Sequence, residues 1–345
     1  MEEALHLLSD IALRPDFPEE HVVQQQATHR GYLDRFRQSA VSTGNEQYWR
    51  AVYGDTHPYG RSYYGTVQGL RAINRDHVIA HHASAFQPSN AALLITGAVD
   101  ADAIRLHVSQ TFSNGWPTGR VLPTPPIAES AVTPRSVYLI DRPGLVQSFI
   151  RVSAEAPPRS SPDYYALDVL NMIFGGATSS RLGVRLNEET GFTYEARSLL
   201  NSLRTGGTFV AYANVETSTT ASALELFIRE IERVTELSQA DLETAQNVLA
   251  LQYTEPFSAV FGINPVLDQT FIHGLPIEHF NRYEDQIRDV TLRDLHRVAK
   301  RYLTLDRMSF TVVGDLDSIE DDIRDLAIGP VTILTADDIW GPARG

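Results

Sequence analysis

The stretch Asn90-Ala-Ala-Leu-Leu-Ile-Thr-Gly-Ala-Val-Asp100 resembles a second stretch, Arg307-Met-Ser-Phe-Thr-Val-Val-Gly-Asp-Leu-Asp317, that lies 217 positions further along the chain. In each stretch a short apolar run ends at a glycine, which predicts a strand that turns into a helix. We therefore expect 90–109 and 307–326 to superpose as strand–turn–helix units. A repeat at so long a period indicates two similar domains in one chain.

Other matches occur in the same order in both parts of the sequence. Leu70-Arg-Ala-Ile73 precedes Ile287-Arg-Asp-Val290 by 217 positions, and Asp10-Ile11 precedes Glu230-Ile231 by 220. Each match alone is weak. Together, at offsets of 217 to 220, they favour a true internal repeat over coincidence.

The repeat predicts the domain boundaries. We expect a first domain at residues 1–116, a Pro-rich linker at 117–135 and a second domain at 136–345. The same register puts the start of the first domain about 80 positions before the first residue of the chain. The first domain is therefore expected to be incomplete at its N-terminus. Leu7, Leu8 and Ile11 should then form an exposed apolar patch or be buried against a second molecule.

The second domain contains grouped rather than strictly alternating strands and helices. Strands are expected at 136–141, 147–155, 193–200 and 207–216, with a helix from Ser161 to the Gly175 region. Grouped elements of this kind predict an α+β class with a mainly antiparallel sheet packed with helices. We expect the same architecture in both domains.

Composition excludes several classes of function. The 345 residues carry a formal net charge of −14 and a pI near 5.2, so nucleic acid and anionic lipid are not expected partners. The absence of cysteine excludes disulfides, Cys-bound zinc and thiol nucleophiles. The acidic start of the chain is not a signal peptide, and no apolar stretch is long enough to span a membrane. We expect a soluble protein, and both the bacterial cytoplasm and the periplasm fit.

Two motifs in the second domain carry a family resemblance. Phe174-Gly-Gly-Ala-Thr-Ser-Ser-Arg-Leu182 is followed by Leu186-Asn-Glu-Glu-Thr-Gly-Phe-Thr-Tyr-Glu-Ala-Arg-Ser198. They closely resemble a signature of the insulinase/pitrilysin family of zinc metallopeptidases, which includes the mitochondrial processing peptidases. Leu8 to Phe17 and His57-Pro-Tyr-Gly60 are similar to the first domain of that family. The resemblance implies one half of a clamshell that encloses unfolded peptides.

The resemblance also implies a zinc site, which this sequence lacks. The family motif His-x-x-Glu-His, whose histidines hold zinc while the glutamate activates water, occurs nowhere in the chain. An ungapped match places the third zinc ligand at Tyr32 and a supporting glutamate at Gln25, and neither is a carboxylate. Asp34 lies two positions on, which is the wrong face of a helix. We therefore expect no catalytic residue, no metal ligand and no cofactor on this chain, although the family cofactor is zinc.

A second departure concerns the peptide-binding pair of the family, an arginine followed seven residues later by a tyrosine. Tyr194 occupies the tyrosine position, but Asn187 stands at the arginine position. Arg185 is two residues away and is expected to point elsewhere. The resemblance thus implies a peptide contact at Asn187 and Tyr194 with the charged half missing.

Two other features have weaker interpretations. His77 and His81 share a helical face and His82 adjoins them, but no carboxylate is placed to complete a metal site, so an ordinary helix is favoured. The Gly175-Gly176 loop follows a helix and lacks the lysine of a phosphate-binding loop. A peptide-contacting or structural loop is favoured there.

Two hypotheses of function remain from the sequence. The first is a non-catalytic, peptide-binding subunit that forms a homo- or hetero-oligomer with a zinc-bearing family member. The second is a fragment of an active zinc metalloendopeptidase whose zinc-bearing N-terminal part is absent from this chain. Tyr32 and Asn187 favour the first, because both replace residues that the active members require.

Overall fold

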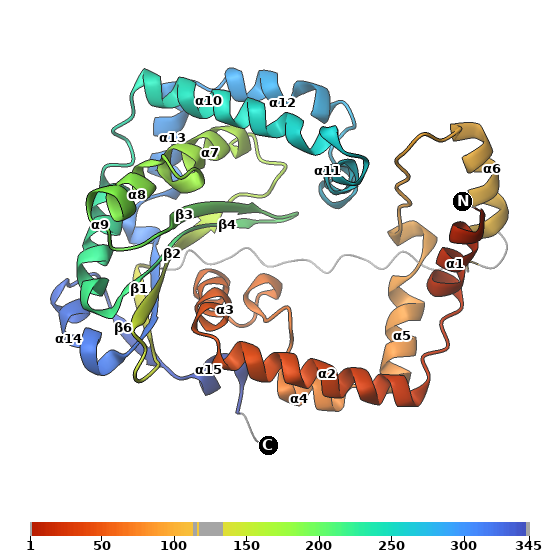
Figure 1. Cartoon of the computed structure of the whole chain (residues 1–345), viewed down its shortest axis with the longest axis horizontal. Helices are drawn as coiled ribbons and strands as arrows, with labels where there is room; N and C mark the ends of the chain where they lie inside the picture. Colours follow the sequence, from red (N-terminus) through yellow and green to blue (C-terminus); the bar gives the residue numbers. More distant parts are fainter. Residues whose placement is uncertain (1, 113–115, 117–133, 343–345) are drawn as a thin grey trace. The chain divides into compact units, whose positions relative to one another are not determined.

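The computed structural model describes residues 2–112, 116 and 134–342, and these residues form two compact units (Figure 1). Unit 1 comprises residues 1–32, 67–126 and 256–274, and unit 2 comprises residues 33–66, 127–255 and 275–345. These units are defined by which residues contact one another in the structure, whereas the domain boundaries expected from the sequence are defined by the internal repeat. Those boundaries stay a prediction, and residues 117–133 of the expected linker lie outside the described residues.

Unit 2 is built on one sheet of six strands with the order β3-β4-β2-β5-β1-β6. β3 pairs with β4, β4 with β2 and β2 with β5 in antiparallel fashion, whereas β1 is parallel to both β5 and β6. The expected α+β class with a mainly antiparallel sheet is confirmed for this unit. The strands are β1 (Ser136–Asp141), β2 (Gln147–Ala156), β3 (Ala196–Ser202), β4 (Gly207–Glu216), β5 (Ser309–Gly314) and β6 (Val331–Leu334).

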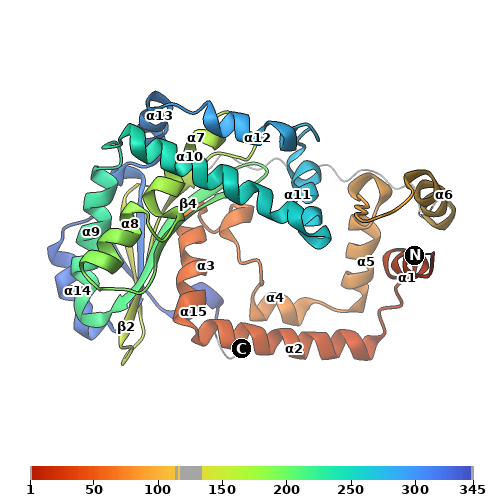
Figure 2. The same cartoon turned by 45° about the horizontal axis from the view of Figure 1, so that its top comes forward.

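The sheet has one apolar face. Ile150 and Val152 of β2, Ala213 of β4 and Phe310 of β5 are almost completely buried on it. Helices cover this face, as Figure 2 shows, and their apolar side chains complete the main hydrophobic core. The helices of unit 2 on this side and at its edges are α7 (Tyr164–Asn171), α8 (Arg181–Gly183), α9 (Thr220–Glu232), α10 (Gln239–Thr254), α12 (His279–Arg288), α13 (Leu292–Tyr302) and α14 (Leu316–Asp325).

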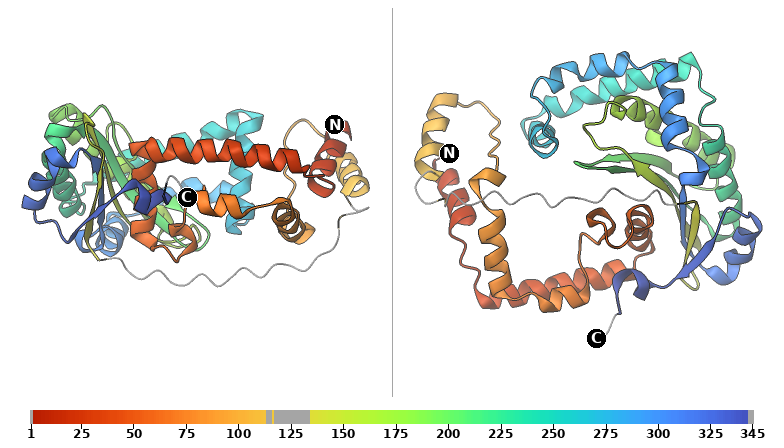
Figure 3. Two further views of the ribbon diagram at one scale, coloured as in Figure 1. Left: turned by 90° about the horizontal axis from the view of Figure 1, so that it is seen from below. Right: turned by 180° about the vertical axis from the view of Figure 1, so that it is seen from behind.

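The other face of the sheet is polar and is covered by a single long helix. Arg151 of β2 lies opposite Tyr212 of β4 and Thr311 of β5 on this face. Helix α3 (Ala40–Tyr53) packs here against β2 and β5, on the side of the sheet away from α7 (Figure 3, right). Gly44 lies at this contact, where an added Cβ would be 3.4 Å from the Val313 side chain, an ordinary van der Waals distance. The short α15 (Ala336–Trp340) packs beside α3.

The end of α3 is fixed to the sheet through the backbone of Gly207. The Tyr53 hydroxyl donates to the Gly207 carbonyl oxygen at 2.6 Å and accepts from the Gly207 amide at 2.7 Å. Trp49 and His57 both stack against the Tyr53 ring. Both backbone groups of the first residue of β4 are therefore satisfied by one side chain.

The substitution Tyr53→Phe removes both of these hydrogen bonds while keeping the ring. Because the Gly207 amide and carbonyl are then left unpaired in a buried place, we expect unfolding to become easier by about 2 to 3 kcal/mol. Urea denaturation followed by circular dichroism measures the change. Tyr63→Phe, in a ring that is 94% exposed, is the matched control. A loss for Tyr53→Phe no larger than that of this control would contradict the role assigned to Tyr53.

Helix α12 is joined to α7 through His279. An Arg159 amino group donates to His279 Nε2 at 2.8 Å, and His279 Nδ1 lies 3.0 Å from the Tyr165 hydroxyl. Since a guanidinium can only donate, Nε2 is the acceptor and Nδ1 carries the proton. Burial and the positive charge of Arg159 lower the pKa of His279 to about 4.

This lowered pKa predicts a pH dependence of stability. His279 binds a proton near pH 6.5 in the unfolded chain but only near pH 4 in the folded chain. The stability that neutral His279 gives the folded chain is therefore complete above pH 6.5 and is lost as the pH falls toward 4. We expect about 2 kcal/mol less stability at pH 4.5 than at pH 7 from this residue. The variant His279→Gln keeps an acceptor for Arg159 but cannot titrate, and its stability should vary less over that range. An unchanged pH profile in urea titrations, with exposed His21→Gln as control, would refute the assignment.

Unit 1 is helical in its described residues. Its helices are α1 (Glu2–Leu13), α4 (Val67–Ala72), α5 (Arg75–Ala85), α6 (Ala101–Phe112) and α11 (Val260–His273), and α2 (Glu19–Gln38) runs from this unit into unit 2. α1 packs on α6, and Leu5 and Ile104 are buried. Leu7, Leu8 and Ile11 are 60%, 40% and 69% exposed, as expected from the sequence.

The strand expected at 91–96 does not form, and this part of the prediction was wrong. In unit 2 the corresponding strand, β5, lies between β2 and β1. Among the described residues of unit 1 there is no strand to pair with 91–96, and an extended segment without a neighbour cannot satisfy its backbone groups. The sheet expected for the first domain is therefore absent from the described residues of unit 1.

Helix bounds nevertheless recur at the spacing of the repeat. α5 and α13 have the same length and begin 217 positions apart, each after a capping box. α3 and α11 have the same length and begin 220 positions apart, each followed by a glycine with positive φ. α3 belongs to unit 2 and α11 to unit 1. These positions support the proposal of a duplicated unit in which each copy gives one helix to the other.

Candidate ligand-binding site

The expected peptide-binding pair lies on one turn of unit 2. Asn187 is in the short helical turn Val184–Glu189, and its amide nitrogen donates to the Tyr194 carbonyl oxygen at 3.0 Å. The Tyr194 side chain is 97% exposed. Arg185 instead forms ion pairs with Glu189 and Glu230, so it points elsewhere as expected. The Tyr194 ring is therefore accessible to a ligand. That Tyr194 contacts a bound peptide stays a prediction.

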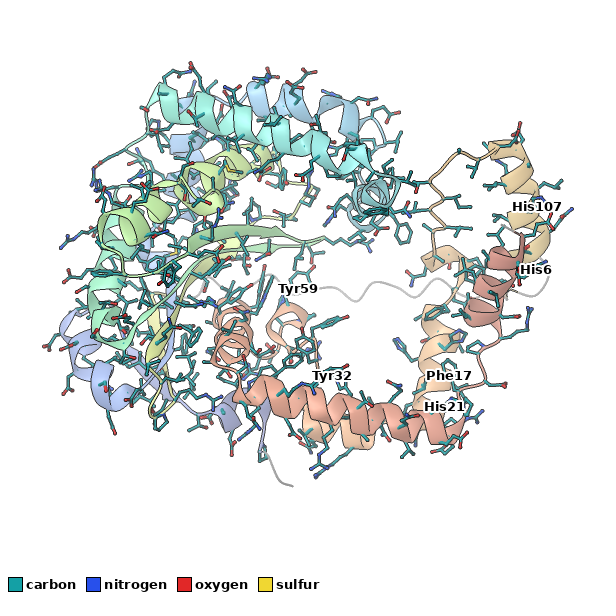
Figure 4. All side chains as sticks on the ribbon, viewed as in Figure 1. His6, Phe17, His21, Tyr32, Tyr59 and His107 are labelled. Carbon is teal, nitrogen blue, oxygen red and sulfur yellow. The ribbon has the colours of Figure 1, made fainter. Side chains whose placement is uncertain are left out.

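Tyr32 lies on α2, where its ring contacts His29 and is 43% exposed (Figure 4). Gln25 is exposed on the same helix. Within residues 2–112, 116 and 134–342, no group of three or more His, Cys, Asp and Glu side chains could hold a metal ion. A phenol hydroxyl and an amide are not among the ligands that hold zinc in proteins.

Two of the three histidines of α5, His77 and His82, have structural partners. His77 Nδ1 accepts from the Asn74 amide in a capping box, and His82 Nε2 lies 3.0 Å from the Ala12 carbonyl oxygen.

The Gly175 loop is tightly packed, because an added Cβ at Gly175 would lie 2.5 Å from the Ser198 amide. This packing favours the structural interpretation of that loop.

Unit 2 has a cavity of about 1060 Å³ between α3, the loop that follows it and the polar face of the sheet. We call it the Arg151 cavity. Its wall is rich in aromatic rings, which include Tyr48, Trp49, Tyr59, Tyr64, Tyr212 and Trp340. None of these residues was a candidate from the sequence. The one available signal was the alternation of β4, which places Tyr212 and Asn214 on the face away from the core.

The loop that closes one side of this cavity contains the His57-Pro-Tyr-Gly60 motif. His57 Nδ1 accepts from the Tyr59 amide at 3.0 Å and so begins the 3₁₀ turn Pro58–Gly60. An added Cβ at Gly60 would lie 1.9 Å from the Gly54 carbonyl oxygen, so this position requires glycine. The motif places Tyr59 at the cavity (Figure 4), where its hydroxyl pairs with Thr205 at 2.9 Å.

Arg151 lies at the base of the cavity and is only 4% exposed. Its Nε donates to Asn45 Oδ1 at 2.9 Å, and one amino group donates to the carbonyl oxygen of Ile150 at 2.8 Å and to Asn214 Oδ1 at 3.4 Å. The guanidinium lies 5.0 Å from the centre of the Tyr212 ring. Burial lowers the pKa of Arg151 to about 10. In the part of the chain that the structure describes, no carboxylate pairs with this cation.

Comparisons with known proteins place this architecture. Residues 72–249, just over half of the chain, match the family Peptidase M16 inactive domain. The chain belongs to the M16 peptidase family. A crystal structure of a peptidase M16 inactive domain from Pseudomonas fluorescens has a TM-score of 0.83 at 22% identity, covering 91% of this chain and 75% of that one. This likeness shows that the fold is the M16 half-clamshell.

Two relatives in sequence carry names that refer to proteases. An uncharacterised zinc protease of Mycobacterium leprae is 25% identical over 207 residues, which are 60% of this chain and 41% of the relative. A probable inactive metalloprotease of Bacillus subtilis is 22% identical over 311 residues, 87% of this chain and 71% of the relative. This chain thus spans less than half the length of the first relative. Its matched region is the inactive domain of the family.

Among the described helices, none is both long and apolar enough to cross a membrane.

Proposed function

We propose that this M16 member is a non-catalytic, peptide-binding subunit that acts beside a zinc-bearing member of the same family. The observation that carries the proposal is the pair of departures at Tyr32 and Asn187. The first replaces the third zinc ligand by a phenol, and the second replaces the charged half of the peptide contact by an amide that is turned onto the backbone of Tyr194.

The proposal separates binding from catalysis. An exposed ring such as that of Tyr194 offers apolar area to an extended peptide at a low entropic cost. Cleavage needs a metal-activated water and therefore a complete ligand set. The match to the inactive domain and the Bacillus subtilis relative support this separation.

The second candidate is a fragment of an active zinc metalloendopeptidase. The Mycobacterium leprae relative, a zinc protease by name and more than twice as long as the region it shares with this chain, favours it. Tyr32 argues against it, because restoring further sequence would leave that position without a carboxylate. Turnover that requires residues of this chain would favour the fragment.

Metal content and cleavage test the proposal together. After dialysis against buffer without chelator, we expect the molar ratio of zinc to protein, measured by elemental mass spectrometry, to be well below one. A quenched fluorescent peptide should not be cleaved by the chain alone, with or without 1,10-phenanthroline. The matched positive control is a zinc-bearing M16 peptidase under the same conditions. Phenanthroline-sensitive cleavage by the isolated chain, abolished by a substitution within it, would establish the fragment instead.

The binding half of the proposal has its own test at Tyr194. Because this side chain is 97% exposed, Tyr194→Ala should change the free energy of unfolding by no more than about 0.5 kcal/mol. It should weaken the binding of an unstructured peptide several-fold in isothermal titration calorimetry, as loss of an aromatic contact does. Phe261→Ala, at a ring that is 84% exposed, is the matched control. Equal affinities for both variants and the unmodified chain would remove Tyr194 from the proposed site.

A further inference from the structure

We propose that the Arg151 cavity binds the carboxylate of an organic acid that has an apolar or aromatic body. Two sources share this chemistry, the C-terminus of a peptide and a small free carboxylic acid. The inference goes beyond the proposed partner role and does not depend on it, because every residue of the cavity belongs to unit 2.

The first argument is the donor set at the base of the cavity. Since Arg151 only donates, Asn45 and Asn214 must turn their amide oxygens toward it, which leaves their NH₂ groups facing away. Both asparagines line the cavity. Among the described residues neither NH₂ group donates elsewhere, and the second amino group of Arg151 makes no hydrogen bond. The cavity thus presents several donors around one cation, an arrangement that suits an anion.

The second argument is the buried charge of Arg151. A guanidinium removed from water without a carboxylate costs stability, and its remaining amino group has no acceptor. A bound carboxylate supplies both the opposite charge and the planar pair of acceptors that a guanidinium prefers. A carboxylate therefore provides both the negative charge and the hydrogen-bond acceptors that Arg151 lacks among the described residues.

The third argument is the wall of the cavity. Trp49, Tyr64 and Trp340 offer aromatic surface, and the volume of about 1060 Å³ accommodates several residues of a peptide or one aromatic acid. The ionisable side chains that line it besides its tyrosines are Arg151, Arg61 and Glu46. A phosphate dianion would meet only these two cations beside an acidic side chain, whereas a single negative charge matches them. A carboxylate is therefore favoured over a phosphate.

Acid and amide forms of the same ligands test the proposal. The probes are a tetrapeptide ending in phenylalanine with a free carboxylate, its C-terminal amide, N-acetylphenylalanine and N-acetylphenylalaninamide. Isothermal titration calorimetry with the full chain should show that an acid binds at least about tenfold tighter than its amide, as a charge-assisted hydrogen bond provides. If only the peptide acid binds, the source is a peptide C-terminus. If N-acetylphenylalanine binds equally well, the source is a small acid.

The decisive variant is Asn214→Asp, which is isosteric and places a carboxylate 3.4 Å from the Arg151 amino group. It satisfies the cation from within the chain and repels an acidic ligand, so the preference for acid over amide should disappear. Asn247→Asp is the matched control, because Asn247 also accepts from an arginine, at 3.3 Å, but lies on the surface of α10. It should keep the preference. Circular dichroism verifies that both variants are folded.

Equal affinity of the unmodified chain for acid and amide would overturn the proposal, as would a preference that persists in Asn214→Asp. These results are independent of zinc content and of cleavage. A failure here would therefore leave the non-catalytic role intact, and zinc-dependent cleavage by the chain would leave this carboxylate site intact.

Discussion

The packing of α3 on the polar face of the sheet is the contact on which unit 2 depends. The opposite face is apolar and is covered by helices α7, α9 and α13, and α10 packs on α7. The polar face cannot be buried in the same way, because its strands carry residues such as Arg151 and Thr311. One helix, fixed at its end by Tyr53 to both backbone groups of Gly207, covers part of this face and leaves a cavity over the rest. Helix α3 thus both packs on the sheet and lines the Arg151 cavity.

This arrangement gives the M16 member a proposed binding site that does not involve zinc. Catalysis in the family rests on a metal held by histidines and a carboxylate, and Tyr32 stands where that carboxylate is expected. The Arg151 cavity instead uses a buried cation, two amides and aromatic walls. A charged group that is retained in a buried place without a counter-ion is a sign of function rather than of stability. The two proposals together describe a subunit that holds a ligand without cutting it.

The sequence predicted the sheet of the second domain well and the Arg151 cavity poorly. The strands at 136–141 and 207–216 could be predicted because apolar alternation is a local property, and the family motifs around Leu182 and Tyr194 identified the fold. The strand at 91–96 was wrong because a strand also needs neighbours, which no local pattern reveals. The Arg151 cavity escaped prediction for a related reason. Arg151 is 106 positions from Asn45 and 63 from Asn214, so only the folded chain brings the donor set together.

A crystal structure of the chain with a bound peptide acid tests the account most directly, because it locates the ligand without reference to any variant. The account predicts electron density for the peptide in the cavity, with its terminal carboxylate within hydrogen-bond distance of Arg151 Nη2 and of the Asn45 and Asn214 amide groups. Density for the peptide elsewhere on the chain, with only ordered water beside Arg151, would contradict it.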